Sequence, residues 1–311
     1  MELKKYKLGE ILELQRGYDL PSSQMKIGSV PVAGSNGVIG YHDTARGNYP
    51  CITVGRSGSV GKVHYYEQPT WAHNTALFVK NFKGNDPKYL YYFLKNLHLD
   101  EMFSKGSSVV PSLDRKVVHS LIVPFQEDKT CQKQIASVLS NIDRKIELNR
   151  AINQNLEAMA KQLYDYWFVQ FDFPNEEGKP YKSSGGNMVW NEKLKRNIPI
   201  GWNNGTLIDI ANITMGQSPD GTSYNEIGEG VLFYQGSTDF GMRFPSVRQY
   251  TTAPSRFAKK GDILMSVRAP VGAVNIANND CCIGRGLSAL NSKIGSTTHL
   301  YYILRACLNF I

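Results

Sequence analysis

Hydrogen-bonding side chains gather in six short stretches of the sequence, five of which contain glycine. Arg can form paired hydrogen bonds with guanine, Asn or Gln with adenine, and Ser or Thr with either base. Small neighbours such as glycine let a backbone approach a partner closely. The residues that we predict to contact DNA on these grounds are Ser35, Asn36, Arg56, Ser57, Ser59, Lys62, Ser107, Ser108, Gln235, Ser237, Thr238, Arg268 and Arg285. The alternative, for each stretch, is that its glycines only form tight turns.

Other patterns that could support catalysis are incomplete. The stretch from Gly55 to Val63 resembles a phosphate-binding loop, but five residues separate its outer glycines, and Val63 stands where Ser or Thr would bind magnesium. Six histidines are scattered without metal-ligand spacing. His73 beside Asn74 either orients a polar group or is a satisfied histidine in a turn.

Neither a nuclease site nor an adenine-methylation motif is complete in the sequence. Asp220 with Glu226 faintly resembles a nuclease site, but the lysine that such a site needs is missing. The chain also contains no Pro-Pro, which the Asn-Pro-Pro-Tyr motif of adenine methylation requires. We therefore expect no catalytic site, no metal and no cofactor in this chain, although an enzyme acting alone is the alternative to be weighed.

The recognition stretches lie in two halves that repeat one another. Three segments of the first half match three of the second in the same order and at a nearly constant offset, which indicates a duplicated domain. Each copy has short runs rich in Val, Ile, Thr and Tyr, followed by a helix that carries Leu-Tyr-Tyr. The matched pairs are 7–17 with 206–216, 51–67 with 263–279, and 87–96 with 298–307.

A long helix is predicted between the two copies, from about Glu127 to Phe168. The segment lacks Gly and Pro, and apolar residues recur at alternating steps of four and three, as in a coiled coil. Such a rod is too long for the core of one compact domain, so we expect a partner to cover its apolar seam. The predicted seam residues are Ile135, Leu139, Ile142, Ile146, Asn149, Asn153, Leu156, Leu163 and Trp167.

Two asparagines interrupt this seam, and two interpretations stay open for them. Asn149 and Asn153 either fix the register of a partner helix or are simply solvated. After the helix, the segment 175–202 is either a flexible tether or, as we prefer, an ordered loop strapped to the helix by Trp190 and Trp202.

Composition agrees with a cytoplasmic protein that binds a polyanion. The 311 residues carry a net charge of +8, distributed as +5 over residues 1–126, −1 over 127–173 and +4 over 174–311. The excess thus lies on the two copies and not on the helix, as contacts with phosphate would require. Five cysteines without metal spacing favour a reduced compartment, and no apolar run is long enough to span a membrane.

The sequence resembles the specificity subunits of type I restriction-modification systems over nearly its whole length. The resemblance is most specific in LIVPFQEDKTCQKQIASVLSNIDRKIELNR (121–150) and in LEAMAKQLYDYWFVQFDFPNEEGKPYKSSGGNMVWNEKLKRNIPIGW (156–202). It implies an α+β protein with two similar α/β target-recognition domains and a long coiled-coil-type helix between them. The corresponding segments are a first domain at 1–126, the spacer helix at 127–173, a linker loop at 174–195 and a second domain at 196–311.

The resemblance also implies function and partners. Each domain of such a subunit reads one half of a split double-stranded DNA target, and the helix sets the gap and docks methyltransferase subunits. Those subunits transfer a methyl group from S-adenosylmethionine to adenine, and restriction subunits use ATP and Mg to translocate and cut DNA. The chain itself is then non-catalytic.

The end of the sequence departs from the family pattern. In the register of the first half, Ile311 corresponds to Glu101, so we expect an incomplete second domain and no second helix to cover the seam. A second copy, a separate fragment or a methyltransferase subunit would have to supply that cover. The alternative is a silent or donor copy without activity of its own.

Overall fold

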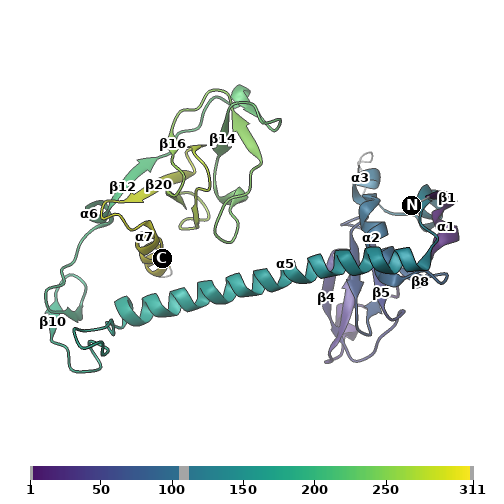
Figure 1. The fold of residues 1–311 in the computed structure, drawn as a ribbon, viewed down its shortest axis with the longest axis horizontal. Helices are drawn as coiled ribbons and strands as arrows, with labels where there is room; N and C mark the ends of the chain where they lie inside the picture. Colours follow the sequence, from purple (N-terminus) through teal and green to yellow (C-terminus); the bar gives the residue numbers. More distant parts are fainter. Residues whose placement is uncertain (1–2, 105–111, 309–311) are drawn as a thin grey trace. The chain divides into compact units, whose positions relative to one another are not determined.

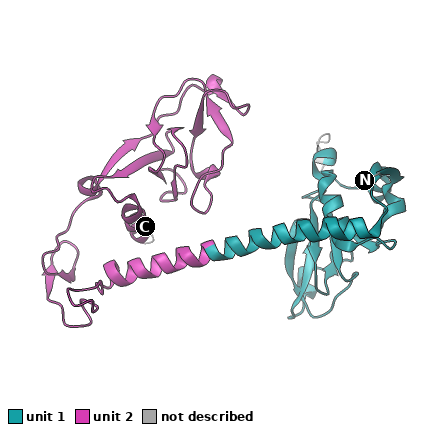
Figure 2. Cartoon of the chain, in the orientation of Figure 1, with its two compact units in different colours: residues 1–152 teal, residues 153–311 magenta. Residues whose placement is uncertain are grey.

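The computed structural model describes residues 3–104 and 112–308, so the predicted Ser107 and Ser108 lie outside the described residues. Contacts divide the chain into two compact units, residues 1–152 and 153–311 (Figure 2). Each unit combines helices with sheets, and one long helix, α5 (Lys129–Tyr164), crosses the boundary between them (Figure 1). The predicted α+β class with two sheet-rich domains and a long helix is therefore confirmed.

Unit 1 is built on a four-stranded antiparallel sheet of order β2-β8-β5-β6 and a three-stranded sheet of order β4-β3-β7. All five residues of β5, Cys-Ile-Thr-Val-Gly, are buried, as a run of β-branched residues in a central strand requires. A further pair, β1 with β9, joins the two ends of the domain. The strands are β1 Lys4–Lys7, β2 Glu13–Arg16, β3 Val30–Gly34, β4 Gly37–His42, β5 Cys51–Gly55, β6 Val63–Tyr66, β7 Trp71–Ala72, β8 Ala76–Asn81 and β9 Ile122–Phe125.

The Leu-Tyr-Tyr helix of unit 1, α2, closes the core and contacts α5. Asp86 caps its first turn by accepting a hydrogen bond from the Tyr89 amide at 2.8 Å, and Pro87 follows at the first helical position. Leu90 and Leu94 point into the core, whereas the Tyr92 hydroxyl donates to Asp143 on α5 at 2.8 Å. The helical segments of this unit are α1 Leu8–Ile11, η1 Ser22–Gln24, α2 Pro87–Asn96, α3 Leu99–Ser104 and α4 Arg115–Ser120.

Unit 2 contains the second copy of this arrangement. Its four-stranded antiparallel sheet has the order β12-β20-β17-β18. A five-stranded sheet of order β13-β15-β14-β19-β16 corresponds to the sheet β4-β3-β7 of unit 1, since β14 pairs in parallel with β19 as β3 does with β7. Before them, β10 and β11 form a hairpin in the linker. The strands are β10 Met188–Asn191, β11 Arg196–Pro199, β12 Ala211–Met215, β13 Tyr224–Asn225, β14 Val231–Tyr234, β15 Gln249–Thr251, β16 Phe257–Ala258, β17 Ile263–Ser266, β18 Val274–Ile276, β19 Cys281–Ile283 and β20 Leu287–Ser292.

Helical segments of unit 2 repeat the first copy as well. Leu300 and Leu304 of α7 are buried against the sheet, as the matching Leu90 and Leu94 of α2 are in unit 1. The segments are η3 Gly221–Ser223, η4 Ser237–Asp239, α6 Leu207–Ile210 and α7 Thr297–Leu308.

Backbone hydrogen bonds confirm the predicted duplication in detail. The Gly61 amide donates to the Gly55 carbonyl at 2.8 Å, and the matched Gly272 amide donates to the Ser266 carbonyl at 2.9 Å. Both Gly61 and Gly272 have a positive φ, +79° and +90°, which a residue with a side chain rarely adopts. The shared glycine is therefore required by the turn that it forms.

The long helix α5 runs over Lys129–Tyr164 and continues as one π-helical turn, η2, over Asp165–Val169. Its 36 residues extend for about 54 Å at 1.5 Å per residue. Gln132, fully buried, fixes the first turns because its side chain bonds to the Asp86 amide, to Asn85 and to the Gln126 carbonyl.

The linker is ordered, as predicted, but only one of its two tryptophans packs as expected. Trp202 stacks on Phe173 with ring centroids 5.4 Å apart and lies against Phe168 and Phe171, which follow α5. Trp190 is 53% exposed and its indole donates to Glu192, so the expectation that it straps the loop to the helix was wrong. Trp202 therefore packs this segment against the residues that follow α5, and the Arg196 guanidinium adds a hydrogen bond to the Val169 carbonyl and lies over the Phe171 ring.

Candidate nucleic-acid interface

Two loops of unit 1 that carry predicted residues come together with a third that carries His73. They are the turn between β3 and β4, the loop between β5 and β6, and the stretch between β7 and β8. Lys62 donates to the Asn36 side chain at 2.9 Å, which ties the first loop to the second. A Cβ on Gly55 would lie 2.7 Å from the Ser35 carbonyl oxygen and 1.9 Å from that of Ser59, so only glycine allows this approach.

Arg56 and Ser57 are held in this cluster through their backbones. Both amides donate to the Thr75 carbonyl, at 2.9 Å and 3.1 Å, and the Arg56 carbonyl accepts from the Leu113 amide at 2.8 Å. The two side chains are half-buried. A side chain on a backbone that is already fixed suits precise base contacts, because less conformational entropy is lost on binding.

The histidine of the third loop is a satisfied turn residue. His73 Nδ1 lies 2.9 Å from the Thr75 hydroxyl, and burial lowers the pKa of the ring below its usual value. The second of its two predicted interpretations is therefore the correct one.

Asp19 and Arg46, which lie beside these loops, were not among the predicted residues. The Asn74 side chain donates to the Asp19 carboxylate, and Arg46 stacks 4.0 Å above the Tyr18 ring. The signal for Asp19 was available, since it lies two residues after Gly17 as Ser218 lies two after the matched Gly216.

Unit 2 forms a corresponding cluster around Gln235. Its side-chain amide donates to the Ser218 hydroxyl at 2.9 Å, and the Arg285 amide donates to the same hydroxyl at 3.2 Å. A Cβ on Gly284 would lie 2.5 Å from the Gln235 side-chain oxygen, and one on Gly286 equally close to the Gln235 carbonyl oxygen. These glycines therefore serve close packing as well as turns.

Arg268 and Arg285 flank one backbone hydrogen bond of this cluster. The Val267 amide donates to the Gly286 carbonyl at 2.9 Å. Arg268, next to Val267, and Arg285, next to Gly286, therefore lie in neighbouring loops. Both arginines are exposed. The equivalent bond in unit 1 joins Arg56 to Thr75, so Arg285 occupies the place of Asn74.

Ser237 and Thr238 lie on the short helical turn η4, whose last residue is a buried anchor. Asp239 accepts two hydrogen bonds from the Arg248 guanidinium, at 2.7 Å and 3.2 Å. Thr238 is exposed and Ser237 is half-buried. Within residues 112–308, no side-chain hydrogen bond joins Ser237 or Thr238 to the Gln235 cluster.

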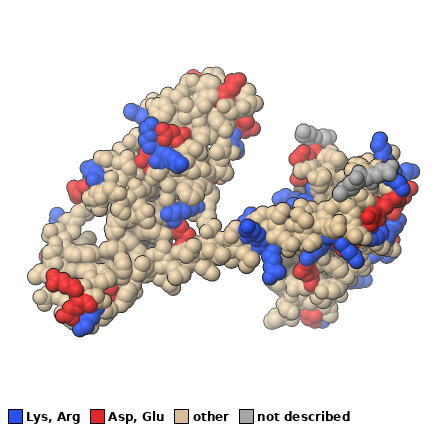
Figure 3. Space-filling model, in the orientation of Figure 1, with Lys and Arg blue, Asp and Glu red and all other residues tan. Residues whose placement is uncertain are grey.

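Charged side chains are interspersed on the face shown in Figure 3. Blue lysines and arginines lie beside red acidic residues on both units, without a continuous basic stripe on this face. Contacts with phosphate would then come from separate lysines and arginines around the loop clusters, which is the usual source of non-specific affinity.

The predicted seam of α5 is partly covered by the chain itself. Ile135 packs against the core of unit 1, and Leu139 is half-buried, whereas Ile142 and Leu156 are 51% and 56% exposed. Asn149 and Asn153 are both exposed, and Trp167 is half-buried. The other predicted seam positions, Ile146 and Leu163, are 42% and 49% exposed.

Residues 3–104 and 112–308 contain neither a candidate metal site nor a helix that could span a membrane. Within these ranges, no three His, Cys, Asp or Glu side chains are grouped as a metal site would need. Nor does any helix there combine the length and apolar character needed to cross a bilayer.

The chain is similar to proteins of one family. Residues 1–158 match the family model of the type I restriction modification DNA specificity domain. The predicted specificity subunit of type I restriction enzyme MjaX from Methanocaldococcus jannaschii is 34% identical over 259 residues, which are 78% of this chain and 57% of that protein. The MjaIX specificity subunit of the same organism is 28% identical over 72% of this chain and 52% of its own length.

The fold has a solved counterpart. A type I restriction-modification S subunit from M. genitalium superposes with a TM-score of 0.59 at 17% identity, covering 98% of this chain and 76% of that one. The present chain spans about half the length of the curated relatives that it matches. With the family model matched over half of its residues, the chain belongs to the type I restriction modification DNA specificity family.

Proposed function

We propose that this chain selects the DNA target of a type I restriction-modification complex, with each recognition domain reading one half of a bipartite sequence. The observation that carries the proposal is the pair of equivalent loop clusters, built on one backbone plan in both units but bearing different side chains. A common scaffold with different hydrogen-bonding groups suits two unlike half-sites.

The central helix would then set the unread spacer and dock methyltransferase subunits. Four of its apolar positions, Ile142, Ile146, Leu156 and Leu163, are exposed in this chain, which supports a protein partner on that face. Methyl transfer, with S-adenosylmethionine, and DNA cleavage, with ATP and Mg, would belong to the methyltransferase and restriction subunits, and the chain would itself be non-catalytic. The silent-copy alternative gains no support from the comparisons.

Selection from a random DNA library tests this function. The full chain, alone and with a cognate methyltransferase subunit, is incubated with the library at about 0.15 M salt, and the bound fraction is sequenced. We expect two short conserved blocks at one fixed separation. A single block, or enrichment without any sequence preference, would contradict the assignment of one half-site to each domain.

A further inference from the structure

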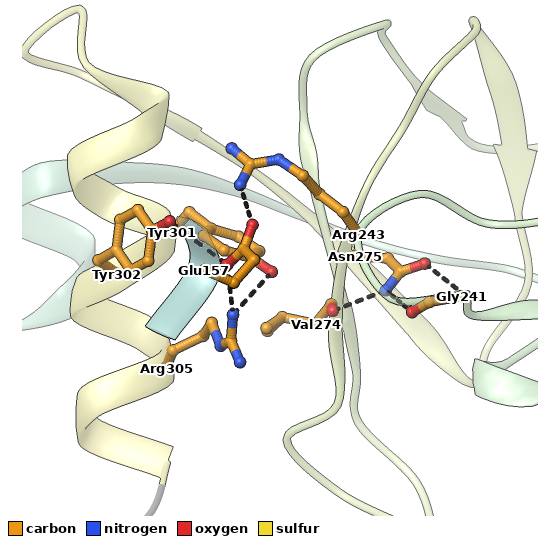
Figure 4. Close-up of polar contacts among 8 residues, drawn as sticks. All are labelled: Glu157, Gly241, Arg243, Val274, Asn275, Tyr301, Tyr302 and Arg305. Atoms are coloured by element: carbon orange, nitrogen blue, oxygen red, sulfur yellow. Dashed lines mark hydrogen bonds and ion pairs between the residues drawn. The ribbon is translucent and has the colours of Figure 1, made fainter. Parts of the chain in front are cut away.

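One carboxylate on the C-terminal part of α5 collects three partners from the second recognition domain (Figure 4). Glu157 has a side chain only 16% exposed, and its two oxygens accept from Arg243, Arg305 and Tyr302. The Arg305 guanidinium lies 2.8 Å from one oxygen, and the Tyr302 hydroxyl 3.3 Å from the same oxygen. Arg243 bonds to the other oxygen. All four residues belong to unit 2.

Arg243 is placed by a loop that is itself fixed to the sheet. Asn275, buried in β18, accepts from the Gly241 amide at 3.0 Å and donates to the Gly241 carbonyl at 2.9 Å (Figure 4). The Ile276 amide also donates to the Arg243 carbonyl at 2.8 Å. The loop thus presents the guanidinium to α5 without having to be ordered by it.

The α7 side of the cluster is equally rigid. Tyr301, 1% exposed, packs into the core, and both guanidiniums lie over its ring, with centroid distances of 5.2 Å for Arg243 and 5.6 Å for Arg305. Arg305 and Tyr302 project from the same helix toward Glu157 (Figure 4). The carboxylate therefore joins two separate elements of the domain, a loop and a helix, at one point on α5.

The positive charges of Arg243 and Arg305 make the contact of the loop and α7 with α5 depend on the Glu157 carboxylate. Two guanidiniums share one negative partner, so its removal leaves two like charges close together and partly buried, with side chains 31% and 37% exposed. Charge-assisted hydrogen bonds are also the stronger kind. The core of the domain does not use Glu157, because Leu300, Tyr301 and Leu304 pack against Ile263 and Leu290 independently of it.

Unit 1 has a simpler version of the same contact. Tyr92, which matches Tyr302, donates to Asp143 at 2.8 Å. The first domain is tied to the helix in other ways as well, through buried Gln132 and through Ile135 in its core. In unit 2, Tyr164 stacks on Tyr302 and Phe168 contacts His299, and Glu157 carries the polar part of the same task.

We propose that Glu157 is the positioning residue that holds the second recognition domain on α5, and that it thereby limits the spacer lengths that this chain accepts between its half-sites. The second part rests on the proposed function. Without the carboxylate, the domain stays folded but samples several orientations on the helix. Half-sites at more than one separation then become acceptable.

A distance measurement tests the first part without DNA. Spin labels are placed at Gln162 on α5 and Asn279 in an exposed turn of the second domain, in full chains with Cys131 and Cys307 changed to Ser. Glu157→Gln should broaden the distance distribution relative to the parent chain. Glu147→Gln removes the same charge from an exposed position of the helix and should leave the distribution narrow.

The folded state of the variants is checked by thermal unfolding and circular dichroism. Should Glu157→Gln unfold, Arg305→Lys, which keeps the charge but loses the planar guanidinium, serves in its place and should broaden the distribution less. A distribution as narrow as that of Glu147→Gln, in the variant used, overturns the proposal.

Mapping of target sequences with the methyltransferase subunit tests the second part. Glu157→Gln should keep both half-site sequences and accept spacers one or two base pairs longer or shorter, whereas Glu147→Gln should keep a single spacer. A single unchanged spacer in a variant with a broadened distance distribution overturns this part. If the parent chain itself selects no split target, the proposed function fails, while the label distances still decide the role of Glu157.

Discussion

At the scale of single residues, the two recognition domains differ where their backbones agree. Asp19 and Asn74 face each other in unit 1, and Ser218 and Arg285 occupy the corresponding places in unit 2. The sequence repeat predicts the glycines that shape these sites, because the turns demand them. It does not predict which polar residues meet, since that depends on contacts between loops far apart in the chain, such as that of Lys62 with Asn36.

Arg56 provides a test of base reading. Arg56→Ala should weaken binding by about 1–3 kcal/mol and relax specificity at one position of the first half-site. Arg115→Ala, which removes the same charge from exposed helix α4, should change affinity equally for all sequences. The measurement is competition binding with targets substituted one base pair at a time. Equal, sequence-independent losses for the two variants would show that Arg56 does not read a base.

His119 makes the first domain sensitive to acid. Its Nε2 accepts from the Leu14 amide at 2.9 Å, and burial, aided by Arg115, lowers the pKa of the ring. A folded-state pKa below the unfolded value of about 6.5 means that protons favour the unfolded chain, so this stability is lost as pH falls below about 6.5.

We therefore expect the unfolding temperature to fall between pH 7 and pH 5, and to fall less in His119→Gln, whose amide oxygen can accept the same bond without titrating. Calorimetry across this pH range provides the comparison. Parallel curves for the two proteins would exclude His119 as a source of the pH dependence.

At the scale of elements, the long helix was predictable and its covered part was not. Heptad spacing from Ile135 onward gives the helix and its apolar side, as the structure confirms. The pattern cannot tell that Ile135 belongs to the core of the preceding domain, because that contact depends on how α2 closes the domain. The exposed apolar stripe of α5, which consists of Ile142, Ile146, Leu156 and Leu163, is thus shorter than the predicted seam.

Substitutions along α5 separate these two parts. Ile142→Gln with Leu156→Gln should cost less than about 0.5 kcal/mol each in the free energy of unfolding, because both side chains are half-exposed, yet should weaken co-purification with a methyltransferase subunit. Ile135→Gln should instead destabilise the chain by about 1–3 kcal/mol, since it places an amide against the core. Unaltered co-purification of the double variant would argue against docking on this stripe.

At the scale of the molecule, a repeat, a long helix and a basic charge were sufficient to predict two domains of related fold. The order of strands within each domain could not be predicted, because short Val- and Tyr-rich runs pair with partners distant in the sequence. The linker shows the same limit. Its two tryptophans look alike in the sequence, but only Trp202 has aromatic neighbours to pack on.

In the proposed function, this chain gives a methyltransferase its target sequence. The most direct measurement is a map of adenine methylation in genomic DNA from cells that express the chain with a cognate methyltransferase subunit, compared with cells that lack only this chain. We predict a split motif, two short blocks around a fixed unread gap, that disappears when the chain is removed. Methylation that is unchanged by removal of the chain would contradict the account.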